Sequence, residues 1–552
     1  MNEEKVKRSR VHSGGLGTSS SAEKRQRNDR SKSDTYLDPE VIVLLSEEDE
    51  KSEMFGCNKS LVSPLRLLYN PSYGKRGSVN ELFINKGAVV FSELVGVADL
   101  METFQFNFSI DVNLFTSCLH PNMLKTHRKI TFVTGSELLN VNSEESLDTL
   151  RSRFEMHEVI ADMPFRFGSH HSKFMVNFFE DLTCEIVIMS CNLQEVDLLA
   201  LTQMCWRSGR LVKDSGAPKE DNDFKRDFIN YLRRYKKTPI SELATVLREY
   251  SFLNIDVELV ASAPGRYDLS RASDKSEIYG YGKLRQVLQR NGLLVDNDGR
   301  ERKFRFLAQV SSIAYPYTLH QKRTSSIFSH LLCPLIFSGK EPAKMLEPGK
   351  ESSEEHQDRF NYVPYIVFPS TQDITESNSG VYAGQAIHFK FDSTATHRNH
   401  YNQCIKPYLC KWNSSISADE TGREKVPPHV KLYICDNGDE WETFRFVLMG
   451  SHNLSKQAWG GPDTLKFVGT DPSKYTISSY ELSVLVPGKS ENSDPSVKEL
   501  KSVYRDDQFS MRANTNARPI RMPFKVPPKR YAPDDEPWSI SKYMGTLLSN
   551  LA

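Results

Sequence analysis

The sequence predicts an α/β protein built from two similar halves. From about residue 60 onward, short apolar runs typical of β-strands alternate with the periodic pattern of amphipathic helices. A strand–turn–strand unit flanked by the same polar residues occurs twice, far apart in the chain. We expect the likeliest domain boundary near residues 254–261, between the two copies of this unit. The clearest expected strands cover 88–94, 129–133 and 185–190, and the clearest expected helices cover 241–250 and 281–289.

Length and composition fit a large folded protein. The chain has 552 residues, 38% of them hydrophobic, which is enough for two to four domains of roughly 150 residues. Its 71 basic and 71 acidic residues cancel, which excludes a uniformly basic coat for nucleic acid but allows a locally basic groove. No apolar run reaches about 18 residues and no apolar segment follows the first Met, so we expect neither a membrane span nor secretion.

The cysteines predict neither a disulfide framework nor a zinc site. Their number, nine, is odd, and no Cys-x-x-Cys pair occurs. We expect reduced, mostly buried thiols.

Residues 1–55 differ from the rest and are predicted to form a disordered basic tail, because they contain few aliphatic side chains. Basic clusters at 5–10 and 24–27 resemble a bipartite nuclear import signal and predict a nuclear location, with a plain solvated charged tail as the alternative. The run Val41–Leu45 and the acids at 46–50 resemble a segment that binds SUMO or sumoylated proteins, although such runs also occur by chance. Four polar inserts are expected to be surface loops: 213–222, 347–358, 414–425 and 490–496.

The doubled unit contains the candidate catalytic residues. In each copy a His-x-Lys pair leads into a strand, a turn and a second strand that ends in Ser-x-Asn-Leu, and Asn follows His by 21 or 24 residues. His and Lys two apart in a strand share one face, and Asn at the end of the paired strand can reach the same spot. The two sets are His171, Lys173 and Asn192 in the first copy, and His429, Lys431 and Asn453 in the second.

Three further His-x-Lys sequences lack this context. They begin at His127, His320 and His388, and we expect all three histidines to be surface residues. Asp436 stands seven residues after His429, but its Asp-Asn-Gly setting predicts a turn residue rather than a catalytic one.

A doubled His-Lys-Asn unit resembles the phospholipase D superfamily, and Phe178 in place of an aspartate seven residues after His171 resembles the tyrosyl-DNA phosphodiesterase family. Further similarity lies at 167–171, 426–429, 453–460 and 479–483, and weaker similarity runs from about 63 to 538. The resemblance implies two α-β-α sandwich halves with mixed sheets, related by a pseudo-twofold axis, with the active site between them. We expect the first half at 56–255 and the second at 256–552.

The resemblance also implies residue roles. His171 would attack phosphorus and His429 would serve as general acid and then base, while the lysines and asparagines of both motifs hold the phosphate. No metal or cofactor is then expected. In the family a glutamine, here Gln203, faces the first histidine, and a glutamate, here Glu481, faces the second. A neutral amide would keep His171 uncharged and nucleophilic, whereas a carboxylate would favour the imidazolium that His429 needs.

The implied substrate is a tyrosine joined to a DNA 3′-phosphate in a stalled topoisomerase I adduct, at a single-stranded or frayed end. The phenol is a good leaving group, with a pKa of about 10, so other 3′ blocking groups should be removed more slowly. The implied partners are this DNA and the topoisomerase-derived peptide, with no membrane and no need for a dimer. By resemblance Phe167 stacks on a base, unless it packs in the core, and Ser312, Ser455 and Phe108 lie along the DNA, whereas Trp538 is left unassigned.

Two other functions stay open at this point. Phospholipid hydrolysis would use the same His and Lys residues, but no amphipathic membrane-binding helix is evident in the sequence. A non-catalytic scaffold that binds SUMO and DNA would have no use for a second proton donor.

Overall fold

The computed structural model describes residues 62–71, 84–123, 128–136, 139–140, 151–214, 222–271, 273–296, 302–314, 317–319, 323–338, 352–414, 420–462, 473–504 and 517–544. All of them lie in one compact unit, residues 40–552. A first unit, Met1–Pro39, lies outside the described residues. The described residues also do not include the two basic clusters, the segment predicted to bind SUMO, His127 or His320. The predictions made for these stay predictions.

The first half is built on a mixed sheet whose strands lie in the order β1-β9-β8-β7-β2-β4-β6. Strands β4 and β6 run parallel to β2, and the other pairings are antiparallel. The strands are β1 (Leu65–Leu67), β2 (Leu100–Phe106), β4 (Lys129–Thr134), β6 (Glu155–Ile160), β7 (Phe174–Phe179), β8 (Cys184–Met189) and β9 (Met204–Arg207).

The second half repeats this topology. Its strand order, β10-β23-β20-β19-β12-β16-β18, matches the first sheet strand for strand, with the same parallel and antiparallel pairings. Two further strands, β24 and β25, join beside β20. The strands are β10 (Glu258–Ser262), β12 (Phe304–Gln309), β16 (Tyr362–Val367), β18 (Leu409–Cys410), β19 (Lys431–Asp436), β20 (Phe444–Gly450), β23 (Glu481–Pro487), β24 (Glu499–Val503) and β25 (Ala517–Arg521).

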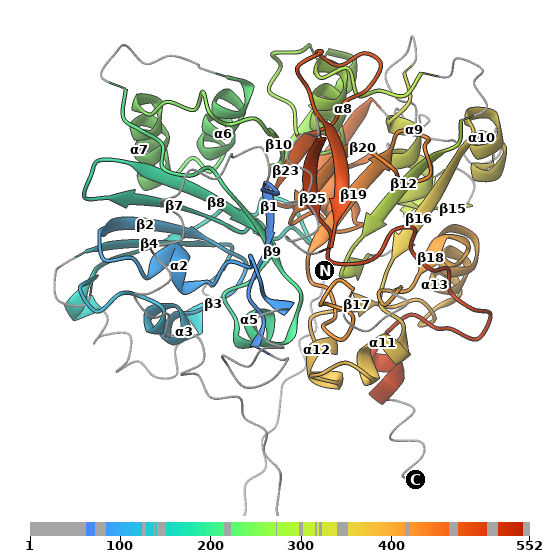
Figure 1. Ribbon diagram of the computed structural model, residues 1–552, viewed down its shortest axis with the longest axis horizontal. Helices are drawn as coiled ribbons and strands as arrows, with labels where there is room; N and C mark the ends of the chain where they lie inside the picture. Colours follow the sequence, from blue (N-terminus) through green and yellow to red (C-terminus); the bar gives the residue numbers. More distant parts are fainter. Residues whose placement is uncertain are drawn as a thin grey trace, which may run out of the picture. The chain divides into compact units, whose positions relative to one another are not determined.

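Helices cover both faces of each sheet, so each half is an α-β-α sandwich (Figure 1). In the first half α6 and α7 lie over one face, and α2 and α3 over the other. The helices of the first half are α2 (Ser92–Val95), α3 (Val112–Ser117), α5 (Glu195–Ala200), α6 (Asp223–Arg233) and α7 (Thr238–Val246), followed by η6 (Leu247–Glu249). Those of the second are η7 (Leu269–Arg271), α8 (Tyr281–Arg290), η9 (Phe328–Leu332), α9 (Cys333–Leu335), α10 (Ser353–Phe360), α11 (Thr371–Thr375), α12 (Val381–Gly384), α13 (Ala395–His400), η10 (Tyr401–Ile405), η11 (Lys406–Tyr408) and α14 (Lys456–Trp459).

Short sheets complete the fold and hold loops beside the main sheets. Strand β13 pairs with β17, β11 with β22, β22 with β21, β14 with β15, and β3 with β5. Their bounds are β3 (Ile110–Asp111), β5 (Leu139–Asn140), β11 (Gly265–Asp268), β13 (Ser312–Ile313), β14 (Tyr317–Leu319), β15 (Arg323–Ser325), β17 (His388–Phe389), β21 (Gly461–Pro462) and β22 (Lys474–Ile477).

The central strands are continuous apolar runs because both faces of each sheet are covered. Every residue of β8 and of β20 is buried, which is the pattern of strands enclosed between two helical layers. The eight cysteines in the described part of the chain are all buried and free. No described helix is both long enough and apolar enough to cross a membrane.

Most of the expected elements are confirmed, but one strand is not. The runs at 129–133 and 185–190 form β4 and β8, and the helices expected at 241–250 and 281–289 are α7 with η6, and α8. The strand predicted at 88–94 is wrong. Within this run only Val89 makes an isolated β-bridge, with Leu68, and helix α2 begins at Ser92. Phe91, Leu94 and Val95 cover the sheet instead of extending it, and a short apolar run does not distinguish these two roles.

Two of the predicted surface loops also prove to be ordered or buried structure. Residues 353–358 belong to α10. Residues 421–424 are buried, and the guanidinium of Arg423 donates to the carbonyl of Leu68 at 3.3 Å and to Oδ1 of Asn85 at 2.9 Å in the first half. A polar insert can be buried where its charges find partners in a neighbouring layer. The boundary expected near residue 255 stays a prediction, because residues 40–552 form one unit.

A buried ion cluster joins the two halves. Asp227 on α6 lies 3.2 Å from Nζ of Lys283 and 3.0 Å from Nη2 of Arg290, both on α8, and all three side chains are less than one-tenth exposed. Arg290 also pairs with Glu258 at the start of β10. Removing one partner of such a cluster leaves buried charge uncompensated, which costs about 3–5 kcal/mol.

We therefore expect Asp227→Ala to lower the free energy of unfolding by about 3–5 kcal/mol, as measured by urea denaturation. The matched control is Asp256→Ala, which breaks an exposed pair with Arg518 at 2.9 Å and should cost less than about 1 kcal/mol. Equal losses in the two variants would show that the cluster contributes no more than a surface pair.

Candidate active site

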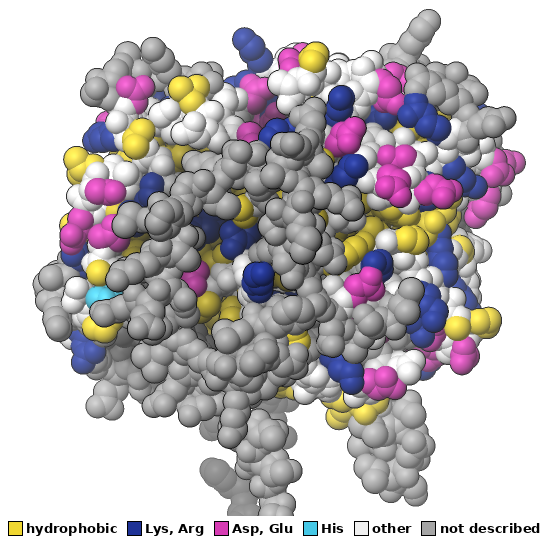
Figure 2. All heavy atoms as spheres, in the orientation of Figure 1, with side chains coloured by type: hydrophobic (Ala, Val, Ile, Leu, Met, Phe, Trp, Pro, Cys, Tyr) yellow, Lys and Arg dark blue, Asp and Glu magenta, His cyan; other side chains and the backbone are white. Residues whose placement is uncertain are grey.

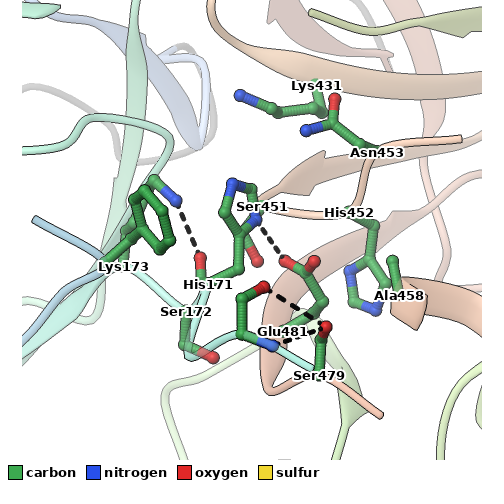
Figure 3. Close-up of polar contacts among 12 residues, drawn as sticks. His171, Ser172, Lys173, Lys431, Ser451, His452, Asn453, Ala458, Ser479 and Glu481 are labelled. Carbon is green, nitrogen blue, oxygen red and sulfur yellow. Dashed lines mark hydrogen bonds and ion pairs between the residues drawn. The ribbon is translucent and has the colours of Figure 1, made fainter. Parts of the chain in front are cut away.

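The first histidine is held by residues of both halves. His171 stands three residues before β7, and its backbone N–H donates to the carbonyl of Tyr480 at 2.9 Å. Its ring Nδ1 lies 2.8 Å from Oε2 of Glu481, the first residue of β23 (Figure 3). An ionised carboxylate only accepts hydrogen bonds, so the proton lies on Nδ1 and leaves the Nε2 lone pair free.

The second histidine is held in the same crossed manner. The backbone N–H of His429 donates to the carbonyl of Thr202 in the first half at 3.0 Å. Its Nδ1 lies 3.0 Å from Oδ1 of Asp197 and 3.3 Å from Nε2 of Gln203. Each imidazole therefore meets a carboxylate from the other half of the molecule.

These contacts correct the pairing that the resemblance implied. Glu481 faces His171, and Gln203 faces His429, the reverse of the expectation. The reason is geometric: Gln203 immediately precedes β9 and Glu481 begins β23, and each of these strand ends reaches across to the histidine of the opposite half. The argument that an amide keeps His171 neutral while a carboxylate charges His429 is therefore wrong.

The two motifs share one electrostatic site. Burial lowers the pKa of Lys173 to about 8, although the negative charges of Glu481 and Asp197 raise it. Burial, and then the positive charge of Lys173, hold the pKa of Lys431 well below its usual value. Two fully buried ammonium groups that repel each other form a site that favours an anion, because a bound negative charge relieves the repulsion and raises both pKa values.

The imidazoles respond to the same charges. Burial lowers the pKa of His171, and Lys173 lowers it further, while Glu481 raises it. Burial and then Lys431 lower the pKa of His429 to about 4, against the effect of Asp197. Lys431 also acts on His171, and Lys173 on His429, so residues of the two motifs lie close enough to interact.

Each lysine is fixed by a contact within its own motif, and Asn453 is fixed by the loop that follows β12. Nζ of Lys173 donates to the carbonyl of His171 at 2.8 Å, and Nζ of Lys431 donates to the carbonyl of His429. Oδ1 of Asn453 accepts the backbone N–H groups of residues 311 and 312 at 3.2 and 3.0 Å, which leaves its amide NH2 to face a ligand. Figure 3 shows Lys431 and Asn453 extending toward the same region as the ring of His171.

Aromatic residues border His171. Phe108 stands edge-on to its ring, with centroids 5.6 Å apart, and Nζ of Lys173 lies 5.8 Å from the Phe108 ring. Phe167 is 73% exposed, which excludes the alternative that it packs in the core. Its backbone is left-handed, with φ of 64°, and such conformations in non-glycine residues concentrate at functional sites.

Ser312 and Ser455, predicted to lie along the DNA, both lie close to Asn453, whereas Asp436 and Trp538 are buried. The backbone N–H of Ser312 is held by Asn453, and the hydroxyl of Ser455 accepts the N–H of Ala458 as the cap of α14. Asp436 is buried at the end of β19 and pairs with Arg305 at 3.1 Å, as a structural residue rather than a catalytic one. Trp538 is fully buried, and its Nε1 donates to the carbonyl of Gly384 at 2.8 Å.

Sequence reasoning missed two residues near the site. Asp197 is the carboxylate partner of His429, and its position five residues after Asn192, on the helix that follows the motif, was the signal. His388 is exposed, as expected of a surface residue, but its strand β17 pairs with Ser312, the residue held by Asn453, so it lies beside the site. Partial desolvation of its ring, and then the positive charges of Lys431 and Lys390, lower the pKa of His388.

The fold and the paired His-Lys-Asn motifs define an enzyme of the phospholipase D superfamily. A sequence profile of the tyrosyl-DNA phosphodiesterase family matches residues 76–532. A probable tyrosyl-DNA phosphodiesterase of Schizosaccharomyces pombe is 26% identical over 528 residues, which cover 82% of this chain and 90% of the relative. Tyrosyl-DNA phosphodiesterase 1 of Saccharomyces cerevisiae is 23% identical over 444 residues, 76% of each chain.

The fold is that of the yeast enzyme. The crystal structure of yeast tyrosyl-DNA phosphodiesterase superimposes with a TM-score of 0.65 at 21% identity, covering 86% of this chain and 99% of the yeast chain. The chain belongs to the tyrosyl-DNA phosphodiesterase family and is a hydrolase of that family.

Proposed function

We propose that this protein hydrolyses the bond between a tyrosine and a DNA 3′-phosphate, with His171 as the nucleophile and His429 as the general acid and base. The observation that carries the proposal is the pair of buried imidazoles, each with Nδ1 bound to a carboxylate, beside two buried lysines whose lowered pKa values favour an anion. A phosphodiester supplies that anion, and the lysines and amides stabilise the charge that builds on its oxygens.

In the first step Nε2 of His171 attacks phosphorus while the bond from phosphorus to the tyrosyl oxygen breaks. Glu481 holds Nδ1–H and balances the positive charge that the ring gains when it carries the phosphoryl group. In-line attack puts the leaving oxygen on the far side of phosphorus, where His429 delivers a proton to it. In the second step His429 takes a proton from water, the water attacks phosphorus, and the bond to His171 breaks.

The assignment of His171 as nucleophile is supported by its surroundings rather than by its hydrogen-bond partner, since both rings have a carboxylate. Phe108 covers the edge of the His171 ring and shields the phosphorylated ring from bulk water. Exposed Phe167, four residues earlier in the chain, offers a face on which a DNA base can stack, worth about 1–3 kcal/mol per base.

DNA is proposed to approach over this side of the molecule. Lys173 and Lys431 supply positive charge at the site itself, and Figure 2 shows further lysine and arginine side chains, in dark blue, spread among acidic and apolar ones over one face. Positive charge there would attract the phosphate backbone although the whole chain is neutral. Ser312 and Ser455, which flank Asn453, are proposed to donate to backbone phosphates of a single-stranded or frayed 3′ end.

The site is proposed to act on peptide-linked ends such as those left by topoisomerase I. The phenol of tyrosine leaves readily because its pKa is about 10, so alkyl 3′ blocking groups should react more slowly and depend more on His429. By sequence alone we further propose a nuclear location, recruitment by SUMO through 41–50, and action as a monomer, since one chain supplies both motifs.

The decisive experiment is incubation with a 3′-phosphotyrosyl oligonucleotide in excess EDTA. We expect release of tyrosine and a 3′-phosphate end at the same rate with and without Mg²⁺, because ammonium and amide groups stabilise the transition state. An oligonucleotide with a 5′-phosphotyrosyl end and liposomes of phosphatidylcholine serve as comparisons. Turnover of the liposomes without cleavage of the 3′-tyrosyl end, or strict dependence on a divalent metal, would refute the proposal.

A further inference from the structure

The two halves supply the same positions with different residues. Because the sheets match strand for strand, Gln203 before β9 corresponds to Glu481 at the start of β23. Likewise Asp197, five residues after Asn192, corresponds to Ala458, five residues after Asn453. One half therefore has a carboxylate on the helix and an amide at the strand, and the other has a methyl group on the helix and a carboxylate at the strand.

Each imidazole is therefore bound by one carboxylate, which comes from the strand position for one histidine and from the helix position for the other. His171 receives its carboxylate from the strand position, Glu481, and His429 receives it from the helix position, Asp197. Figure 3 shows Ala458 beside the ring of His452, which lies between Ala458 and Glu481.

Asp197 is built into place. It is 2% exposed, and besides His429 its carboxylate accepts the backbone N–H of Asn192 at 3.0 Å and the side-chain amide of Asn192 at 3.3 Å. Nε2 of Gln203 also donates to Oδ1 at 3.0 Å, while the hydroxyl of Ser190 donates to Oε1 of Gln203 at 2.7 Å. The amide NH2 of Gln203 is thus oriented toward Asp197, and both it and Nδ1–H of His429 donate to the same carboxylate.

We propose that Asp197 is the positioning carboxylate of His429. It accepts the hydrogen bond of Nδ1–H, so that Nε2 faces the leaving oxygen, and its negative charge balances the imidazolium. Gln203 acts on His429 indirectly, by orienting Asp197. The inference rests on the proposed role of His429. During the reaction the proton on Nε2 moves to the tyrosyl oxygen, and the later proton from water returns to Nε2. Asp197 stays ionised throughout, and the proton on Nδ1 does not leave the ring.

The charges around His429 fix the direction of the pH effect. Lys431 and Lys173 oppose its protonated form, and Asp197 is the negative group that favours it. Burial raises the pKa of Asp197, but His429, Asn192 and Lys431 lower it more, so the carboxylate is ionised at neutral pH. Without its charge the pKa of His429 falls further, and the high-pH limb of the rate profile, which reports loss of the acid's proton, moves to lower pH.

The test compares Asp197→Asn with the double variant Asp197→Ala/Gln203→Glu, which recreates at His429 the arrangement that Ala458 and Glu481 provide at His171. We expect Asp197→Asn to lower kcat on the 3′-tyrosyl oligonucleotide by a factor of about 10² with little change in KM. The high-pH limb of the burst rate, which reports the first step, should shift downward, and the covalent intermediate should accumulate because its hydrolysis is slower still. The burst rate should fall less with a 3′-nitrophenyl ester, whose leaving group needs less protonation. The double variant should regain most of the lost rate.

The control is Glu195→Gln, an exposed position on the same helix, which should leave the rate and the pH profile unchanged. Equal losses of burst rate on both esters, an unshifted pH profile of the burst rate and no recovery in the double variant would show that Asp197 is only structural. If the unaltered protein does not cleave the tyrosyl end, the proposed function fails separately. The ¹⁵N shifts of His429 then decide the inference, which requires an Nδ1–H tautomer that Asp197→Asn perturbs.

Discussion

Replacing His171 with alanine will abolish the covalent phosphoenzyme and lower turnover of a 3′-tyrosyl oligonucleotide by a factor of about 10⁴ or more. The loss is this large because no neighbouring group can substitute for the ring. Lys173 is directed to the carbonyl of residue 171, and the ring of His429 is held by Asp197 from the other half. Rapid quenching followed by denaturing gel electrophoresis of a 5′-labelled substrate measures both the adduct and the product.

The matched control for this variant is His157→Ala. His157 is an exposed histidine of the same half, 2.9 Å from Glu155 on the same strand, and its loss should leave turnover unchanged. Binding of substrate by His171→Ala should survive, because Lys173, Lys431 and both asparagines are intact. A covalent adduct that persisted in His171→Ala and disappeared in His429→Ala would reverse the two roles.

The sequence was sufficient to bring together the histidine, lysine and asparagine of each candidate motif, because their relation is local. His171 and Lys173 lie two residues apart immediately before β7, and β8 returns beside this strand to end near Asn192. Strand periodicity and a short turn fix these positions within one hairpin. The repetition of the hairpin then predicted a second, equivalent half, and the matching strand orders confirm it.

The partners of the histidines could not be predicted in this way because they depend on how the two halves pack. Gln203 and Glu481 lie at equivalent strand ends, and nothing in their local sequence shows that each reaches the opposite half. The same holds for Arg423, whose buried guanidinium donates to the first half from a segment that composition alone assigns to the surface. Interactions between distant segments are set by tertiary packing, which residue patterns do not encode locally.

His429→Ala is expected to separate the two chemical steps. Attack by His171 should still occur, because tyrosine leaves with a pKa of about 10 and needs only partial help from an acid. Hydrolysis of the adduct should be slowed by roughly 10²–10⁴, because no base then activates water. The protein should therefore accumulate with the DNA 3′-phosphate joined to His171, and turnover should stop after about one equivalent of tyrosine is released.

The adduct can be identified by its chemistry. A phosphorus–nitrogen bond to imidazole is labile in acid, so brief acid treatment should release the oligonucleotide. A stable ester to a serine or tyrosine would survive the same treatment. The burst of tyrosine should equal the amount of trapped protein, and the double variant His171→Ala/His429→Ala should show neither. If His429→Ala released no tyrosine and trapped no DNA, then proton donation would limit the first step. Asp197, which binds Nδ1 of His429 at 3.0 Å as Glu481 binds Nδ1 of His171 at 2.8 Å, would then be as important for the attack as for the hydrolysis.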